Sequence, residues 1–315
     1  MTKQKYGVTE LHSGALSCVK IEDVSLFDVS KVFDCGQSFR FDRVSASKHE
    51  NEFAGCVHGK YISIAKDGST LYIYNITLAE YEAFFEKYLA LDRDYDEINR
   101  EILKVSKNPT LAEAINTSGG IRILCQEPWE AVCSFIISQN NNIPRIKKII
   151  AALSKKCGKT VDTSLMLGHI ADAHMDNDGN FYSFPTPEEI IPLGVDGLFE
   201  LKTGFRAKYI FDAASRIQNG EIDLDMLKEI NSTVECSDIL CQIKGVGPKV
   251  AACALLFGFA RLDAFPVDVW IKKVMAKYFD PDFTPESLGR YAGIAQQYLF
   301  YYERYLIGEK GENKK

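Results

Sequence analysis

The chain has 315 residues, 46% hydrophobic and 25% charged, which is typical of a globular protein of about two domains. It has no run of roughly 18 apolar residues that could span a membrane, and its first residues lack the apolar core of a signal peptide, so we expect a cytoplasmic protein without a membrane anchor. A net charge of −6 disfavours a nucleic-acid partner, but residues 140–161 are rich in Lys and Arg and contain no acidic residue, which predicts one basic face.

The first third of the chain has the pattern of an antiparallel sheet. Residues 61–65 and 70–74 are rich in β-branched and aromatic residues and flank an Asp-Gly turn, which predicts a β-hairpin. Thr77 and Glu80 have the spacing of a capping box, so a helix is expected from there to about residue 91. A second helix is expected from about residue 95 to the Asn-Pro pair at 108–109, where we place a domain boundary.

Helical periodicity covers most of the remaining chain. Pro128 suits the first position of a helix that is apolar on most faces, and residues 143–153 form an amphipathic, basic helix. The polar segment 157–183 is rich in turn residues, with a hairpin tip at Asp178–Gly179, and no role is assigned to it. Further helices are expected to begin at residue 186 and to cover 198–217, 226–243, 248–259, 267–278 and 285–306. The sequence therefore predicts an α+β protein with an antiparallel-sheet domain, residues 1–108, and a mostly helical domain, residues 109–315.

Gly245 and Gly247 stand between two of the expected helices. They do not form a dinucleotide fingerprint, because a helix precedes them and position 250 is Val. The two glycines permit positive φ, so that their backbone amides and those of the next helix can bind phosphate. A tight turn between two packed helices would explain the glycines equally well.

Lys249 and Asp268 are the candidate catalytic residues. Lys249 lies in the first turn of a helix, where the helix dipole disfavours a cation, and this position suits an amine that must be neutral to attack. Asp268 is expected to cap the next helix, and capping alone would explain it. A carboxylate near an amine also suits chemistry through a cationic, sugar-like transition state.

The glycine turn, Lys249 and Asp268 resemble the signature of the helix-hairpin-helix DNA glycosylases, and the lysine is typical of their lyase-active branch. Three further segments are similar to the 8-oxoguanine DNA glycosylase family: residues 35–40 (CGQSFR), 138–145 (SQNNNIPR) and 291–300 (YAGIAQQYLF). The resemblance extends from about residue 20 to residue 306. It implies the same order of domains, an antiparallel sheet followed by helices.

The resemblance implies that Lys249 attacks C1′ of the damaged nucleotide and forms a Schiff base, after which β-elimination cleaves the strand. Asp268 would stabilise the oxocarbenium-like state. No metal or cofactor is expected: the nine cysteines include no Cys-x-x-Cys pair, and none follows Cys253, where the iron–sulfur ligands of related enzymes would stand. His169 and His174 are interpreted as loop residues.

The resemblance also assigns a pocket for the flipped base. Cys253 and Phe300 would sandwich the purine, and Gln296 would read its Watson–Crick edge. The carbonyl of Gly36 would accept a hydrogen bond from N7–H, which 8-oxoguanine has and guanine lacks. Core packing would also explain Cys253 and Phe300, and a turn would explain Gly36.

Other residues would contact the duplex. By resemblance, Asn140 fills the gap left by the flipped base, and Phe205 wedges the duplex. Arg145 and Arg206 contact the cytosine opposite the lesion; solvation or phosphate contact is the alternative for both arginines. The glycines Gly245 and Gly247 would bind the DNA backbone.

The sequence departs from the family pattern at three places. Phe205 stands where tyrosine is frequent, Trp270 where animal members have a phosphate-binding histidine, and Glu303 where an aspartate is found. Lys272 or Lys273 is a candidate substitute for that histidine.

We therefore expect a bifunctional 8-oxoguanine DNA glycosylase and AP lyase, a monomer that acts on duplex DNA with 8-oxoguanine opposite cytosine, in the nucleoid or the nucleus. A helix-hairpin-helix glycosylase with another damaged-purine preference is one alternative. A non-catalytic module that binds DNA phosphates through the hairpin is another, and it predicts no dependence on Lys249.

Overall fold

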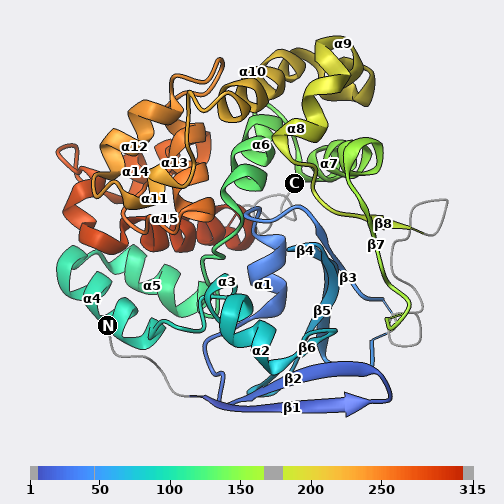
Figure 1. The fold of residues 1–315 in the computed structure, drawn as a ribbon. Helices are drawn as coiled ribbons and strands as arrows, with labels where there is room; N and C mark the ends of the chain where they lie inside the picture. Colours follow the sequence, from blue (N-terminus) through green and yellow to red (C-terminus); the bar gives the residue numbers. More distant parts are fainter. Residues whose placement is uncertain (1–5, 46, 167–179, 308–315) are drawn as a thin grey trace, which may run out of the picture.

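The N-terminal part of the computed structural model, which describes residues 6–45, 47–166 and 180–307, is built on a six-stranded antiparallel sheet (Figure 1). The strand order is β1-β2-β6-β5-β4-β3. The strands are β1 (Gly7–Ser13), β2 (Leu16–Glu22), β3 (Phe41–Arg43), β4 (Asn51–Val57), β5 (Lys60–Asp67) and β6 (Thr70–Tyr74). The predicted hairpin is confirmed: Asp67 pairs with Thr70, and Gly68 adopts φ +54° in the turn.

One face of the sheet is covered by helices, as Figure 1 shows. These are α1 (Val29–Asp34), α2 (Leu78–Glu80) and α3 (Glu86–Tyr88), with a π-helical turn between α2 and α3. The predicted capping box is present, because Thr77 accepts the N–H of Glu80 while the Glu80 carboxylate accepts the N–H of Thr77. Apolar side chains of the strands and helices form one buried core, which includes Ile21, Val32, Phe33, Phe53, Ile62, Leu71 and Phe85.

The other face of the sheet is covered by the segment to which the sequence assigned no role. Two short strands, β7 (Thr160–Val161) and β8 (Phe181–Tyr182), pair antiparallel. Val161 is buried in a cluster with Cys56 of the sheet, and the ring of Phe181 stacks on Tyr61 at 3.9 Å between centroids. The predicted hairpin tip at Asp178–Gly179 lies outside the described residues. The insertion thus shields the second face of the sheet.

The rest of the chain is helical, and the predicted α+β class is confirmed. The helices are α4 (Tyr95–Ser106), α5 (Pro109–Ser118), α6 (Pro128–Ser138), α7 (Ile143–Cys157), α8 (Pro187–Ile190), α9 (Gly194–Leu198), α10 (Ala207–Gln218), α11 (Met226–Glu229), α12 (Thr233–Leu240), α13 (Pro248–Gly258), α14 (Val269–Tyr278) and α15 (Ala292–Tyr301). α4 buries Tyr95, Ile98 and Ile102 in the helical core, although it precedes the proposed boundary. The boundary between residues 108 and 109 stays a prediction. Across the described ranges, every helix is too short or too polar to span a lipid bilayer.

Three predicted helices, 198–217, 226–243 and 285–306, are wrong as single units. The first is interrupted where Lys202 and Gly204 adopt φ of 65° and 62°. The second ends at residue 229, because the guanidinium of Arg261 donates to carbonyls at its C-terminal end, and a new helix starts after Ser232. In the third, Gly289 at φ +71° separates a 3-10 turn from α15. The second interruption depends on contacts of Arg261, which periodicity does not encode.

The buried side chain of Arg122 ties the N-terminal part of the chain to the helical part. Its guanidinium donates to the carbonyls of Leu26 and Ala90 at 2.7 and 2.6 Å. It also donates to the hydroxyl of Tyr6 and lies 4.6 Å from the ring centroid of Tyr95. Only 1% of Arg122 is exposed, so these backbone carbonyls depend on it for their hydrogen bonds.

We expect Arg122→Met to lower the free energy of unfolding by about 3 kcal/mol, because it leaves several buried carbonyls without a donor. Urea unfolding followed by circular dichroism measures the loss. Arg100→Met is the control, because Arg100 is exposed and donates to the carbonyl of Asp96 on its own helix. Equal losses in the two variants would contradict this role of Arg122.

Candidate active site

A cleft of about 680 Å³ opens between the turn after α1 and the helices α6, α7, α13, α14 and α15. Several predicted site residues line it: Gly36, Asn140, Gly247, Lys249, Asp268 and Phe300. The cleft also contains Phe39 and Phe135 on its walls and Lys272 at α14. The structure therefore brings together residues that are far apart in the sequence.

The glycine turn joins α12 to α13 as predicted. Gly245 adopts φ +79°, and a Cβ at this position would lie 2.4 Å from the ring of Tyr209, so only glycine fits. Gly247 does not use the positive φ that glycine permits: its φ is −107°, and it is the N-cap residue of α13. A Cβ at Gly247 would meet nothing within 4 Å, so this glycine leaves the N-terminus of α13 open to a ligand.

Lys249 and Asp268 lie at the N-termini of two different helices and face the same cleft. Lys249 is the second residue of α13, and its amine lies 6.0 Å from the ring centroid of Phe135. Asp268 caps α14, because its Oδ1 accepts the N–H of Ile271 at 2.8 Å. The capping interpretation of Asp268 is therefore correct, and the same carboxylate also borders the cleft where the amine lies.

Two of the predicted base-pocket residues, Cys253 and Gln296, are buried and do not line the cleft; each lies one helical turn from a residue that does, Lys249 on α13 and Phe300 on α15. Cys253 is 5% exposed and Gln296 is 4% exposed, while Phe300 is half-buried on the cleft wall. Burial raises the pKa of the Cys253 thiol, and the nearby Lys249 offsets only part of this effect, so the thiol is a neutral, apolar surface at physiological pH. The Oε1 atom of Gln296 is buried and has no hydrogen-bond partner in the described part of the chain. A buried acceptor without a donor is unfavourable unless a ligand supplies one.

Gly36 lies in a turn that is fixed from both sides. It adopts φ +85°, which strains any other residue. The side chain of Gln37 is fully buried and donates to the carbonyls of Val32 and Arg122, both at 2.9 Å, and its oxygen accepts the N–H of Leu124. On the other side, Gln297 of α15 donates to the carbonyl of Cys35. The sequence did not single out either glutamine, because a buried amide and a solvated one look alike in a single sequence.

Solvation at the surface, one of the alternatives for Arg206, is wrong. It is 2% exposed, and its guanidinium donates to the carbonyls of Gln139, Asn140 and Thr203. Burial and the charge of Arg145 lower the pKa of Arg206. The guanidinium thus holds the loop of Asn140, whose φ is 48°. Arg145 is exposed on α7, and Phe205 is 46% exposed.

The departures from the family pattern have defined surroundings. The amine of Lys273 lies 4.8 Å from the ring centroid of Trp270, whereas Lys272 lines the cleft. Glu303 accepts hydrogen bonds from Lys277 and from the hydroxyl of Tyr278. Of the two lysines considered as substitutes for the histidine, Lys272 is the one placed at the site.

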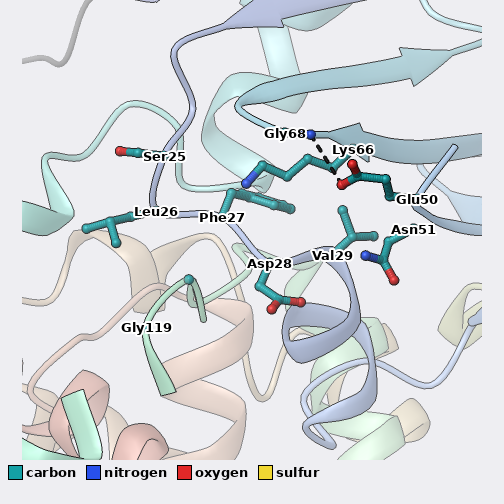
Figure 2. A pocket seen from close by; sticks show the side chains of 11 residues that line it. Ser25, Leu26, Phe27, Asp28, Val29, Glu50, Asn51, Lys66, Gly68 and Gly119 are labelled. Atoms are coloured by element: carbon teal, nitrogen blue, oxygen red, sulfur yellow. Dashed lines mark hydrogen bonds between the residues drawn. The ribbon is translucent and has the colours of Figure 1, made fainter. Parts of the chain in front are cut away.

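A separate hollow of about 200 Å³ contains none of the predicted site residues (Figure 2). It lies between residues 25–29, the turn at Gly68 and the backbone of Gly119. Lys66 reaches across it, and burial lowers the pKa of this amine. Among the described residues, no group of three or more His, Cys, Asp or Glu side chains is placed to hold a metal ion, and His169 and His174 lie outside these residues.

Comparison with known proteins identifies the family. Residues 19–132 match the N-terminal domain of 8-oxoguanine DNA glycosylase, and residues 133–287 match the HhH-GPD superfamily of base-excision DNA repair proteins. The fold superposes with a TM-score of 0.83 on MBOgg1, solved with a low-affinity DNA ligand, at 38% identity over 96% of this chain and 99% of that one. This chain belongs to the 8-oxoguanine DNA glycosylase family.

Two other relatives agree with membership of this family. The 8-oxoguanine glycosylase/lyase of Clostridium acetobutylicum, solved with duplex DNA containing cytosine opposite 8-oxoguanine, is 35% identical, with a TM-score of 0.81 over 96% of this chain and 99% of that one. The N-glycosylase/DNA lyase of Saccharomyces cerevisiae is 36% identical over 49% of this chain, and the match spans only 41% of the yeast protein. The predicted family is confirmed, and with it the enzyme class of N-glycosylase/DNA lyase.

Two adjacent buried glutamines of this glycosylase fold should respond in opposite ways to the same substitution. We expect Gln296→Met to raise the free energy of unfolding by about 1 kcal/mol, because it removes a buried acceptor for which the described part of the chain supplies no donor. Gln297→Met should lower it by about 1 kcal/mol, because the carbonyl of Cys35 loses a donor. Urea unfolding of both variants tests this, and a loss of stability in Gln296→Met as large as in Gln297→Met would refute it.

Proposed function

We propose that this chain binds duplex DNA with 8-oxoguanine opposite cytosine, excises the oxidised base and cleaves the strand at the resulting site. One observation carries the proposal: Lys249 and Asp268 border the same cleft. The buried Gln296, whose oxygen has no donor in the described residues, supports it, because it lies one turn of α15 before Phe300 on the cleft wall. A module that only binds phosphates through the hairpin needs neither this amine nor this carboxylate.

The chemistry begins at C1′ of the flipped nucleotide. The Lys249 amine forms a bond to C1′ as the bond from C1′ to the base breaks, and the base leaves with the electron pair and takes up a proton. Asp268 stabilises the positive charge that develops on the sugar. The hydrogen bond from the N–H of Ile271 holds the Asp268 carboxylate in place for this role. Ring opening gives a Schiff base. Loss of a proton from C2′ then expels the 3′ phosphate, and water releases the lysine.

The base is selected by its hydrogen-bonding edges. The buried Gln296 oxygen accepts a donor from the Watson–Crick edge of the purine, while Cys253 and Phe300 enclose its two faces. The carbonyl of Gly36 accepts N7–H of 8-oxoguanine, whereas guanine presents an acceptor there and is repelled. The hydrogen bonds of Gln37 support this assignment, because they fix the turn that presents Gly36.

The remaining contacts are to the duplex. The Clostridium relative was solved with cytosine opposite 8-oxoguanine, and we assign Arg145 and Arg206 to that base. The charge of Arg145 acts on Arg206, since it lowers the pKa of Arg206. In this role Arg206 exchanges some of its backbone partners for the cytosine. Asn140 fills the gap, Phe205 wedges the strand, and the turn of Gly245 and Gly247 with Lys272 binds phosphates. The protein acts where the DNA is, in the nucleoid or the nucleus, and as a monomer.

A covalent intermediate on Lys249 can be trapped. We expect borohydride to link the wild-type protein to a duplex with 8-oxoguanine opposite cytosine, because it reduces the Schiff base to a stable amine. Lys249→Gln should give no adduct, whereas Lys244→Gln, in the same hairpin, should still give one. Denaturing gel electrophoresis detects the adduct. If the wild type forms none and releases no base, the proposed function is wrong.

Asp268→Asn separates catalysis from capping. Asparagine caps a helix about as well as aspartate, so stability should be kept while the negative charge is lost. We expect single-turnover excision to fall about 100-fold and the affinity for lesion-containing duplex to change less than about threefold. Asp263→Asn, whose carboxylate accepts from Thr233, is the control. Equal losses of rate and affinity would instead indicate a structural cap.

A further inference from the structure

One face of α10 connects the exposed Phe205 to the helix-hairpin-helix turn. Phe205 lies just before α10, and its ring meets that of Tyr209 edge to face, with 5.8 Å between the centroids and 71° between the planes. Tyr209 and Asp212 are three residues apart, so their side chains lie on the same side of the helix. Both contact the hairpin, which belongs to a distant part of the sequence.

The ring of Tyr209 packs directly on the backbone of Gly245. A Cβ on Gly245 would lie 2.4 Å from Cδ2 and Cε2 of the ring, a distance that no real contact allows. This contact explains why the hairpin has glycine at this position, besides its φ of +79°. The hairpin cannot move toward α10 without displacing the ring, and the ring touches Phe205.

Asp212 fixes the hairpin by a hydrogen bond. Its Oδ2 accepts the backbone N–H of Lys244 at 2.8 Å and the Nε of Arg216 at 3.0 Å. Arg216 also pairs with Glu221 at 2.9 Å. A carboxylate next to a turn that binds phosphates weakens DNA binding by repulsion. The presence of Asp212 at this place, despite the repulsion, indicates that its role is to hold the turn.

We propose that Tyr209 and Asp212 are positioning residues that couple phosphate binding by the hairpin to the insertion of Phe205 into the duplex. The inference rests on the proposed function. A phosphate bound at the hairpin fixes α10, and the 3-10 turn that leads into α10 carries Phe205 and Arg206, whose guanidinium holds the loop of Asn140. One rigid helix thus sets the distance between the DNA backbone and the residues that enter the base stack. Without the link, the hairpin still binds phosphates but no longer directs Phe205.

The test compares two variants, each of which removes one of the two carboxylates that contact Arg216. Asp212→Ala loses the bond to the hairpin and its bond with Arg216, whereas Glu221→Ala loses its pair with Arg216 and leaves the bond to the hairpin in place. The readouts are the affinity for undamaged duplex, the fluorescence of 2-aminopurine placed next to 8-oxoguanine, which rises as bases unstack, and the single-turnover excision rate.

We expect Asp212→Ala and Tyr209→Ala to lower the fluorescence change and the excision rate about tenfold, with affinity for undamaged duplex within about threefold of wild type. Glu221→Ala should match wild type. Asp212→Asn, which keeps an acceptor for the Lys244 N–H, and Tyr209→Phe, which keeps the ring, should recover most of the loss. Tyr209→Leu replaces Tyr209→Ala if the alanine variant does not fold.

The coupling is refuted if Asp212→Ala behaves like Glu221→Ala in both fluorescence and excision. It is also refuted if affinity for undamaged duplex falls by the same factor as excision, because the residues would then support only the hairpin itself. Absence of excision by the wild type would overturn the proposed function instead.

Discussion

The buried amide of Gln37 is the interaction on which the geometry of the site depends. Its nitrogen donates to the carbonyls of Val32 and Arg122, and its oxygen accepts from Leu124, so one side chain joins α1 to the segment that leads into α6. The neighbouring backbone is held as well, because the amide of Gln126 donates to the carbonyl of Gln37. Gly36 stands between this network and α15, which donates to Cys35 through Gln297. The proposed reading of the base by a backbone carbonyl requires this rigidity, because a mobile carbonyl cannot distinguish a donor from an acceptor at N7.

The site is assembled from helix ends and from unsatisfied groups. Lys249 and Asp268 both lie at helix N-termini, where the dipole favours the carboxylate and disfavours a cationic lysine. The buried oxygen of Gln296 has no donor in the described residues. The lysine at a helix N-terminus and the buried acceptor without a donor lower stability, and such features are expected where a ligand completes the structure. They support the interpretation of the cleft as a binding site more strongly than its volume does.

Much of this arrangement was predictable from the sequence, for identifiable reasons. The hairpin of β5 and β6, the capping box at Thr77 and the starts of α6, α13 and α14 follow from local rules that depend on a few neighbouring residues. The local pattern singled out Lys249 and Asp268, and resemblance to the family added Gly36 and Phe300; the cleft gathers all four.

What could not be predicted depends on distant contacts. The break between α11 and α12 needs the guanidinium of Arg261, the burial of Arg206 needs the loop of Asn140, and Gly245 needs the ring of Tyr209. The insertion at 157–183 covers the sheet through Val161 and Phe181, which nothing in its polar composition indicates.

The most direct test of the account is the single-turnover release of the base from two duplexes, one with 8-oxoguanine and one with guanine opposite cytosine. The two bases differ at N7 and C8. Both bases offer the same Watson–Crick edge to Gln296, and they differ at N7, where we expect the Gly36 carbonyl to separate them. The account predicts release of 8-oxoguanine and no release of guanine above background. Release of both bases at similar rates, or of neither, would contradict it.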